Sequence, residues 1–253
     1  MTEYLHPGQR DVDFPDRLPE DLQTIVWRYI DDWKFIDLIK QHGLYLCRGD
    51  KLQDTFEGTY SRYQIMDQDR WLGEIGYANL IPQEKKQREE NRRNFYVSSW
   101  CMYNHDLDLV WKAYTKVCHA VAVQSRVAKL VAICDKAIEH RPLNVSIVKY
   151  FGHKEGDFIN YFATGFDAFV HKDYHFKLDN EIRIVYMANW AKNQGQTPEG
   201  IVLPVELSVL IERVVLAPGS TSKDAEAIRN LLNEYGLENI TVESSRYEKG
   251  LME

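Results

Sequence analysis

Three separated segments of the chain place polar residues in or at the end of apolar, strand-like sequence. Arg48 ends the run LYLCR, Ser98 and Ser99 stand within FYVSSWCM, and Glu181 opens EIRIVY. Strands are usually filled by branched and aromatic side chains, so polar residues at these places call for an explanation. We expect the guanidinium, a hydroxyl and the carboxylate to converge on one cleft and form a site.

Arg48 can offer two parallel N–H donors to a phosphate or a carboxylate. The loop that follows it contains Asp50, Asp54 and Glu57, so an internal salt bridge is an alternative use of the guanidinium. The three acids could also bind a divalent cation, because oxygen ligands suit Mg²⁺ and Mn²⁺. Asp54 and Glu57 could equally cap exposed backbone N–H groups of the loop.

The serine segment offers one hydroxyl to a cleft, because successive strand residues point to opposite faces. No motif supplies a histidine base, so a positioning role suits Ser98 or Ser99 better than that of a nucleophile. Trp100, with Trp111 and Tyr114 of the following helix, could form a stacking wall for a heteroaromatic ring. Ordinary core packing of these aromatic residues is the alternative.

Glu181 opens a strand in which alternation places Asp179, Glu181 and Arg183 on one face. The carboxylate and the guanidinium therefore either pair or both line a pocket. A glutamate in a cleft can accept a hydrogen bond from a ribose hydroxyl and stabilise positive charge that develops on the sugar. A solvated charge at a strand edge is the alternative.

Composition describes an ordinary globular protein. The chain has 253 residues, of which 44% are hydrophobic, enough for a substantial core. A net charge of −7 disfavours broad attachment to nucleic acid or anionic lipid. The four cysteines lack CxxC spacing, and the chain shows neither a signal peptide pattern nor eighteen consecutive apolar residues. We expect a cytoplasmic protein with reduced thiols that does not enter a membrane.

The order of elements predicts one mixed domain over residues 22–253, preceded by an irregular, polar arm over residues 1–21. Strands are expected at 24–30, 44–48, 95–102, 119–125, 145–151, 181–188, 201–205, 214–218 and 240–245. Helices are expected at 31–43, 81–94, 107–117, 156–172 and 222–236, the last capped by Ser222. The helix at 81–94 is polar all round, and that at 156–172 carries an aromatic stripe typical of core.

Common signatures of nucleotide and hydrolase sites are missing. The chain has no GxGxxG, GxxxxGK[ST], HExxH or GxSxG motif, and its eight histidines are scattered. Rossmann, P-loop and zincin functions are therefore disfavoured, and no metal site is expected from the histidines.

Several segments together resemble a known bacterial family. They are IVWRYID-WKFIDLI, GLYLCRGDKLQDTFEG, SSWCMYNHDLDLVWKAY, FVHKDYHFKLDNEIR and LPVEL-VLIERVVLAP. In order and over nearly the whole chain they resemble the family catalogued as domain of unknown function 2971, which has no settled activity to carry over.

A second resemblance is to mono-ADP-ribosyltransferases of the R-S-E kind. These carry an arginine on an early strand, a serine strand followed by a helix and a strand, and a glutamate that opens a later strand. Arg48, Ser98 or Ser99, and Glu181 match that order. The motif is SSW instead of serine-threonine-serine, which leaves the choice of serine open. Asp179 stands where arginine-modifying members have another acid, which leaves the target residue open.

That resemblance implies an α+β domain with a mixed, largely antiparallel split sheet flanked by helices, and NAD⁺ as substrate without a metal. Arg48 would grip the pyrophosphate or adenosine ribose, and Ser99 or Ser98 would orient the nicotinamide side. Glu181 would hold the nicotinamide ribose and stabilise its oxocarbenium-like transition state. Trp100 or Tyr114 would stack on the ring, and the expected nucleotide contacts also include Trp111 and Asp50.

The leading hypothesis is thus an NAD-dependent ADP-ribosyltransferase or NAD glycohydrolase that acts on an unknown intracellular protein or nucleic-acid acceptor, in bacterial stress or phage defence. One alternative is a metal-dependent phosphoesterase or nuclease that uses the acids Asp50, Asp54, Glu57, Asp179 and Glu181. The other is a non-catalytic nucleotide-binding or protein-interaction domain whose charged residues are structural ties.

Overall fold

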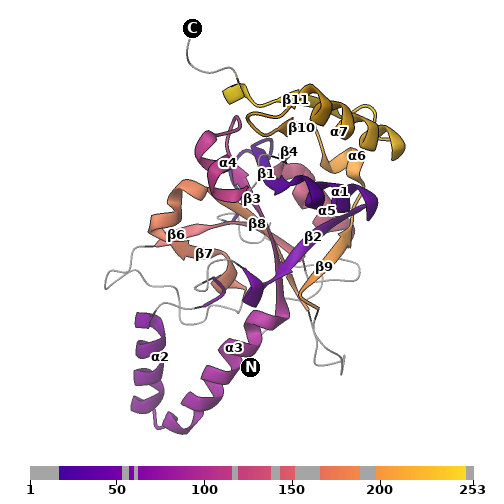
Figure 1. Cartoon of the computed structure of the whole chain (residues 1–253). Coiled ribbons are helices and arrows are strands. Elements are labelled where there is room, and N and C mark those ends of the chain that lie inside the picture. Colours follow the sequence, from indigo (N-terminus) through magenta and orange to yellow (C-terminus); the bar gives the residue numbers. More distant parts are fainter. Residues whose placement is uncertain are drawn as a thin grey trace.

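The computed structural model describes residues 17–52, 57–59, 62–115, 119–137, 143–151, 166–188 and 198–248. Over these residues the protein is an α+β fold built on one large sheet that does not close (Figure 1). Nine strands form this sheet, and all its pairings are antiparallel except the last, between β10 and β11. The largely antiparallel sheet with flanking helices is therefore confirmed, and its likeness to ADP-ribosyltransferases stays a prediction.

The strand order across the main path is β11-β10-β4-β1-β3-β2-β9, and β8 leaves this path to pair with β3 and β5. The strands of this sheet are β1 (Ile25–Asp31), β2 (Gly43–Arg48), β3 (Phe95–Met102), β4 (Ala120–Arg126), β5 (Leu143–Ile147), β8 (Glu181–Met187), β9 (Gly200–Pro204), β10 (Arg213–Leu216) and β11 (Thr241–Ser244). A separate small parallel sheet pairs β6 (Lys149–Phe151) with β7 (His171–Asp173).

The central strand β3 has different neighbours along its two edges. On one edge β8 pairs with it from Phe95 to Cys101. On the other edge β2 pairs with Tyr96 and Val97, and β1 pairs with Cys101 and Met102. The intervening residues 98–100 have β8 as their only strand partner among the described residues, so the sheet is split between β1 and β2.

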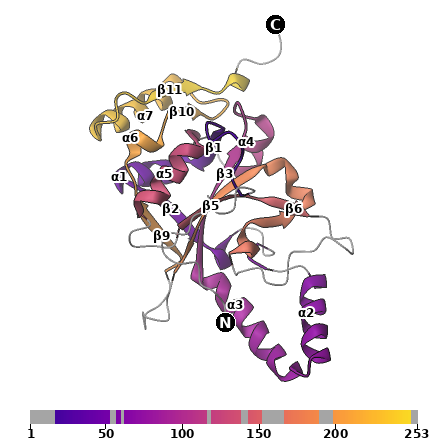
Figure 2. The same ribbon diagram turned by 180° about the vertical axis from the view of Figure 1, so that it is seen from behind.

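Helices cover the two faces of the sheet unequally. The first face of β3, which carries Tyr96, Ser98 and Trp100, belongs to the main core together with apolar residues of several helices. These helices are α1 (Asp32–Lys40), α5 (Val127–Ala137), α6 (Leu207–Leu210) and α7 (Ser222–Glu234). The second face, which carries Val97, Ser99 and Cys101, is covered by α4 (Asp108–Tyr114) at one end, and Figure 2 shows α4 apart from α1, α5 and α7.

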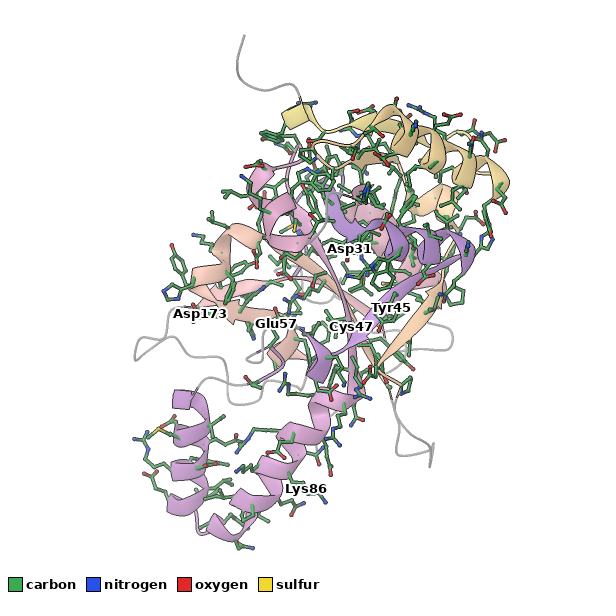
Figure 3. All side chains as sticks on the ribbon, viewed as in Figure 1. Asp31, Tyr45, Cys47, Glu57, Lys86 and Asp173 are labelled. Carbon is green, nitrogen blue, oxygen red and sulfur yellow. The ribbon has the colours of Figure 1, made fainter. Side chains whose placement is uncertain are left out.

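A helical hairpin projects from the body of the protein in both views (Figures 1 and 2). Its helices are α2 (Arg62–Glu74), which the sequence reasoning did not predict, and α3 (Ile81–Asn94), which it did. Lys86, labelled in Figure 3, lies on α3. Within the described ranges no helix is long and apolar enough to cross a membrane.

Some predicted elements differ from the structure. The predicted helix at 156–172 lies mostly outside the described residues, but its last part is wrong: a 3-10 turn at Asp167–Phe169 is followed by strand β7. The predicted strand at 145–151 is two strands, β5 and β6, in different sheets. The cap of α7 is Thr221 instead of Ser222, because Thr221 and Asp224 form a reciprocal capping box.

Candidate functional site

The structure does not bring the arginine and the glutamate of the predicted trio together. Directly paired residues of antiparallel strands point to the same face of a sheet. Arg48 pairs with Tyr96 and so lies on the first face, which also carries Ser98. Glu181 pairs with Cys101 and lies on the second face, which also carries Ser99. The expected convergence of Arg48 and Glu181 is therefore wrong, and Ser99 is the serine on the glutamate's face.

Arg48 is engaged in a local ion pair. Its Nε donates to Oδ1 of Asp50 at 2.5 Å and its Nη2 donates to Oδ2 at 3.1 Å. A third donor, Nη1, lies 3.2 Å from the backbone oxygen of Pro198. Although burial opposes it, the hydrogen bond from Arg48 lowers the pKa of the Asp50 carboxyl. The internal salt bridge, one of the two alternatives for Arg48, is what the structure contains.

Glu181 belongs instead to a buried group of ionisable side chains. We call this group the charge cluster, and its members are Glu57, Lys172, Asp179, Glu181 and Arg183. The Nζ of Lys172 contacts three carboxylates: Asp179 at 2.7 Å, Glu181 at 2.8 Å and Glu57 at 3.1 Å. One ammonium therefore joins a loop, a 3-10 turn and strand β8. Figure 3 labels Glu57 and, on β7, Asp173, which follows Lys172 in the chain.

Arg183 holds the cluster from the sheet side. Its Nε donates to Oε2 of Glu181 at 2.7 Å, and its Nη2 donates to Oε1 of Glu57 at 2.8 Å. Its Nη1 donates to the backbone oxygen of Phe169 at 2.8 Å. The residue is only 1% exposed, and each guanidinium nitrogen has a partner. The rigid fork of arginine thus fixes two carboxylates relative to the backbone.

The charges of the cluster do not cancel, because three carboxylates face two cations. Burial alone would raise the pKa of Glu181, but the charges and hydrogen bonds of Arg183 and Lys172 hold this pKa well below its usual range. Burial raises the pKa of Asp179 in spite of its bond to Lys172. Glu181 is therefore ionised at neutral pH, and the pair of acids is arranged as an electronegative centre.

The members of the cluster differ in their access to solvent. The side chain of Asp179 is 20% exposed, whereas those of Lys172 and Glu181 are 8% and 2% exposed. A molecule from solvent would therefore meet Asp179 first.

Two tyrosine hydroxyls bind Glu181. Tyr114 of α4 donates to Oε1 at 3.2 Å, and the hydroxyl of Tyr150 accepts a bond from the Glu181 backbone N–H at 2.9 Å. Burial and the nearby Glu181 charge raise the pKa of both phenols, so both stay protonated. Of the three predicted stacking residues, Tyr114 is the one that contacts the cluster.

The predicted stacking wall of Trp100, Trp111 and Tyr114 is not formed. Trp100 lies on the first face, where its Nε1 donates to Oγ of Ser98 at 3.2 Å. Trp111 packs on the second face, edge-on against Tyr29 with ring centroids 4.8 Å apart. Core packing, the alternative considered for both tryptophans, is their observed role.

Gly58 sets the position of Glu57. Its φ is +72°, in the left-handed region that favours glycine, and its N–H donates to the backbone oxygen of Ala168 at 3.2 Å. A Cβ at this position would lie 2.4 Å from the ring of Phe169. Phe169 in turn supplies the backbone oxygen bound by Arg183. The close approach of the two segments therefore places Glu57 beside the guanidinium.

A residue with a positive φ also precedes Glu181. Asn180 ends the 3-10 turn at Tyr174–Asp179 with a φ of +44°, a conformation that asparagine tolerates better than most residues. Asn180 thus separates Asp179, the last residue of the turn, from Glu181 at the start of β8. The two acids therefore meet Lys172 from different backbone segments, and not as alternating residues of one strand.

The acids proposed as metal ligands are not assembled as a metal site. Asp50 is bound by Arg48, which lies on the opposite face of the sheet from Glu181. Asp54 lies outside the described residues. Lys172 and Arg183 stand between the other three acids. Among the residues that the structure describes, no group of three His, Cys, Asp or Glu side chains is placed to hold a metal ion.

The sequence reasoning missed Lys172 and Tyr150, and it assigned Glu57 to the loop. A weak signal was present: Lys172 and Asp179 flank a polar stretch directly before Glu181. Nothing in the spacing of Glu57, more than a hundred residues away, connects it to this stretch. The pairing appears only when the fold brings the two segments together.

Comparisons with known proteins do not extend these assignments. No protein-family model matches the chain, and no curated protein matches it in sequence. Both resemblances described above therefore stay predictions.

Proposed function

We propose that the protein consumes NAD⁺ as an ADP-ribosyltransferase or NAD⁺ glycohydrolase, with Glu181 as the residue that stabilises positive charge on the nicotinamide ribose. The observation that supports this proposal best is the ionised Glu181 carboxylate within a cluster of three acids and two cations. A fixed excess of negative charge in a desolvated place stabilises a developing cation more than water does.

In the proposed reaction the bond between ribose C1′ and the nicotinamide nitrogen breaks, and its electron pair leaves with nicotinamide. The ribose then carries oxocarbenium character, which the carboxylate of Glu181 stabilises while it accepts a bond from a ribose hydroxyl. A water molecule or an acceptor group attacks C1′ and releases a proton. Neither a metal nor a redox partner is needed for this step.

The proposal assigns further roles within the second face. Tyr114 orients the Glu181 carboxylate through its hydroxyl, and Ser99 shares the face as a polar neighbour of the substrate. Asp179, as the most exposed acid, contacts the substrate first. Arg48 has no part in this site, because its guanidinium lies on the first face and is bound to Asp50.

A non-catalytic role is the second candidate function. It is favoured by the low exposure of the Glu181 side chain, which is 2%. In this case the charge cluster would tie the 57–58 loop, the small sheet and β8 together, and the protein would bind partners elsewhere.

The two candidates are separated by measuring nicotinamide release from NAD⁺, with and without cell lysate as a source of acceptors. We expect release by the wild type, a loss of at least about a hundredfold in Glu181→Gln, and near wild-type release in Arg48→Ala. Lys112→Met, which removes the exposed partner of Asp108, is the control for a lost surface ion pair. Folding of each variant is checked by its unfolding transition. No release by the folded wild type under any condition, or equal release by folded Glu181→Gln, would contradict the proposal.

A further inference from the structure

The split between β1 and β2 is bridged by an arginine that the charge cluster does not involve. Arg28 lies on β1, and its Nη2 donates to the backbone oxygen of Tyr45 on β2 at 2.9 Å. Its guanidinium carbon is 6.0 Å from the ring centre of the buried Trp100, one of the β3 residues that pair with neither β1 nor β2. Tyr45 and the adjacent Cys47 are labelled on β2 in Figure 3. The guanidinium therefore stands where the sheet opens.

Arg28 has no carboxylate partner among the described residues, in contrast to other arginines of the sheet. Arg126 on β4 binds Glu212 at 2.9 Å, and Arg213 on β10 binds Glu243 at 3.0 Å. Burial lowers the pKa of Arg28 to about 10. A guanidinium has five N–H donors, so most of the hydrogen-bonding capacity of this half-buried cation is unused.

Among the residues that the structure describes, the titratable groups nearest to Arg28 do not supply a countercharge. These groups are the Tyr45 phenol and the Cys47 thiol. Burial raises the pKa of both, so both are neutral at pH 7. Arg48, at the end of β2, pairs with Asp50, and Lys51, in the turn that follows, pairs with Glu199 at 2.5 Å.

We infer that Arg28 marks a binding site for a phosphate group in the split between β1 and β2. An oxyanion there would accept bonds from the unused N–H donors and supply a countercharge to the half-buried guanidinium. The site lies on the first face of the sheet, opposite to the charge cluster. It stands independently of the proposed NAD⁺ reaction, because no residue is shared.

Inorganic phosphate and pyrophosphate are the probes for this site, compared with sodium chloride at equal ionic strength to remove general salt effects. We expect isothermal titration to detect phosphate binding to the wild type, and Arg28→Met to weaken it by at least tenfold. Arg126→Met, which removes a paired arginine of the neighbouring strand, should bind phosphate as the wild type does. Phosphate that acts no differently from chloride, or equal binding by Arg28→Met, would overturn the inference.

Unfolding of the same variants distinguishes a binding arginine from a structural one. Arg28→Met removes a half-buried cation that has no carboxylate partner among the described residues, so its unfolding midpoint in phosphate-free buffer should equal or exceed that of the wild type. A lower midpoint would mean that the guanidinium holds β1 to β2, and would count against the site. If Arg28→Met shows no cooperative transition, Arg28→Lys is tested in its place. We expect Arg28→Lys to fold as the wild type does and to bind phosphate more weakly.

Discussion

Replacement of Lys172 by methionine tests the charge cluster most directly. The substitution keeps the length and apolar stem of the side chain but removes an ammonium that three carboxylates contact within 3.1 Å. Because the Lys172 side chain is 8% exposed, the carboxylates it leaves are desolvated and carry unbalanced charge. Loss of one partner from such a buried group costs about 3–5 kcal/mol. For a chain of this length we expect a fall of roughly 6–20 °C in the unfolding temperature at pH 7.

The pH dependence of this loss identifies its cause. In the wild type the pKa of Glu181 is depressed, so the stability that Glu181 contributes is present at neutral pH and is lost as the pH falls through its folded-state pKa. In Lys172→Met the buried acids no longer face the ammonium, so they bind protons more readily in the folded state than in the unfolded state. The variant therefore gains stability relative to the wild type as the pH falls from 7 toward about 4.

Urea unfolding at pH 7 and at pH 4.5, followed by far-ultraviolet circular dichroism, measures both quantities. Lys112→Met is the matched control, since its ion pair with Asp108 is 2.6 Å long but its side chain is 72% exposed. An exposed pair of this kind contributes about 0–1 kcal/mol, so the control should change little at either pH. If Lys172→Met costs no more than Lys112→Met, or loses the same free energy at both pH values, the electrostatic account of the cluster is refuted.

Two further predictions concern residues beside the cluster. Gly58→Ala should destabilise the fold by about 2–4 kcal/mol, because φ is +72° and the new Cβ would lie 2.4 Å from Phe169. The control Gly76→Ala, with φ +83° and no atom within 4 Å of the Cβ, should cost only about 1 kcal/mol in the same denaturation assay. Burial lowers the pKa of His171 to about 4, so stability should rise with pH between about 4 and 6.5, where the unfolded chain binds the extra proton. A nuclear magnetic resonance titration that places the His171 pKa near 6.5 would contradict this.

The local elements of this fold follow from local sequence. Phe35, Leu38 and Ile39 recur at helical spacing and are buried on α1, and the apolar runs around Val26 and Val123 form strands of the sheet. The hairpin helix α2 was not predicted because its sequence is mostly polar, and among its side chains that the structure describes only Leu72 is buried. Tertiary packing, not helical periodicity, also turns residues 171–173 into a strand.

The composition of the candidate site depends on strand register, which the sequence does not reveal. Alternation correctly separates Ser98 from Ser99, because both belong to one strand. Alternation within one strand cannot tell on which face of β3 the side chain of a residue from another strand will lie. The contact between Glu57 and Arg183 has the same origin, since 126 positions separate the two residues.

A shift of β2 by one residue along β3 would place Arg48 on the face of Glu181, but packing excludes it. Because the side-chain period of a strand is two, such a shift would also turn Leu44 and Leu46 out of the main core. Both leucines are 0% exposed, and returning each to water would cost roughly 2–3 kcal/mol. A new salt bridge between Arg48 and Glu181 would not offset this, since Arg48 would lose Asp50 and Glu181 already has Arg183. The apolar residues of β2 therefore determine that Arg48 and the charge cluster lie on opposite faces of one sheet.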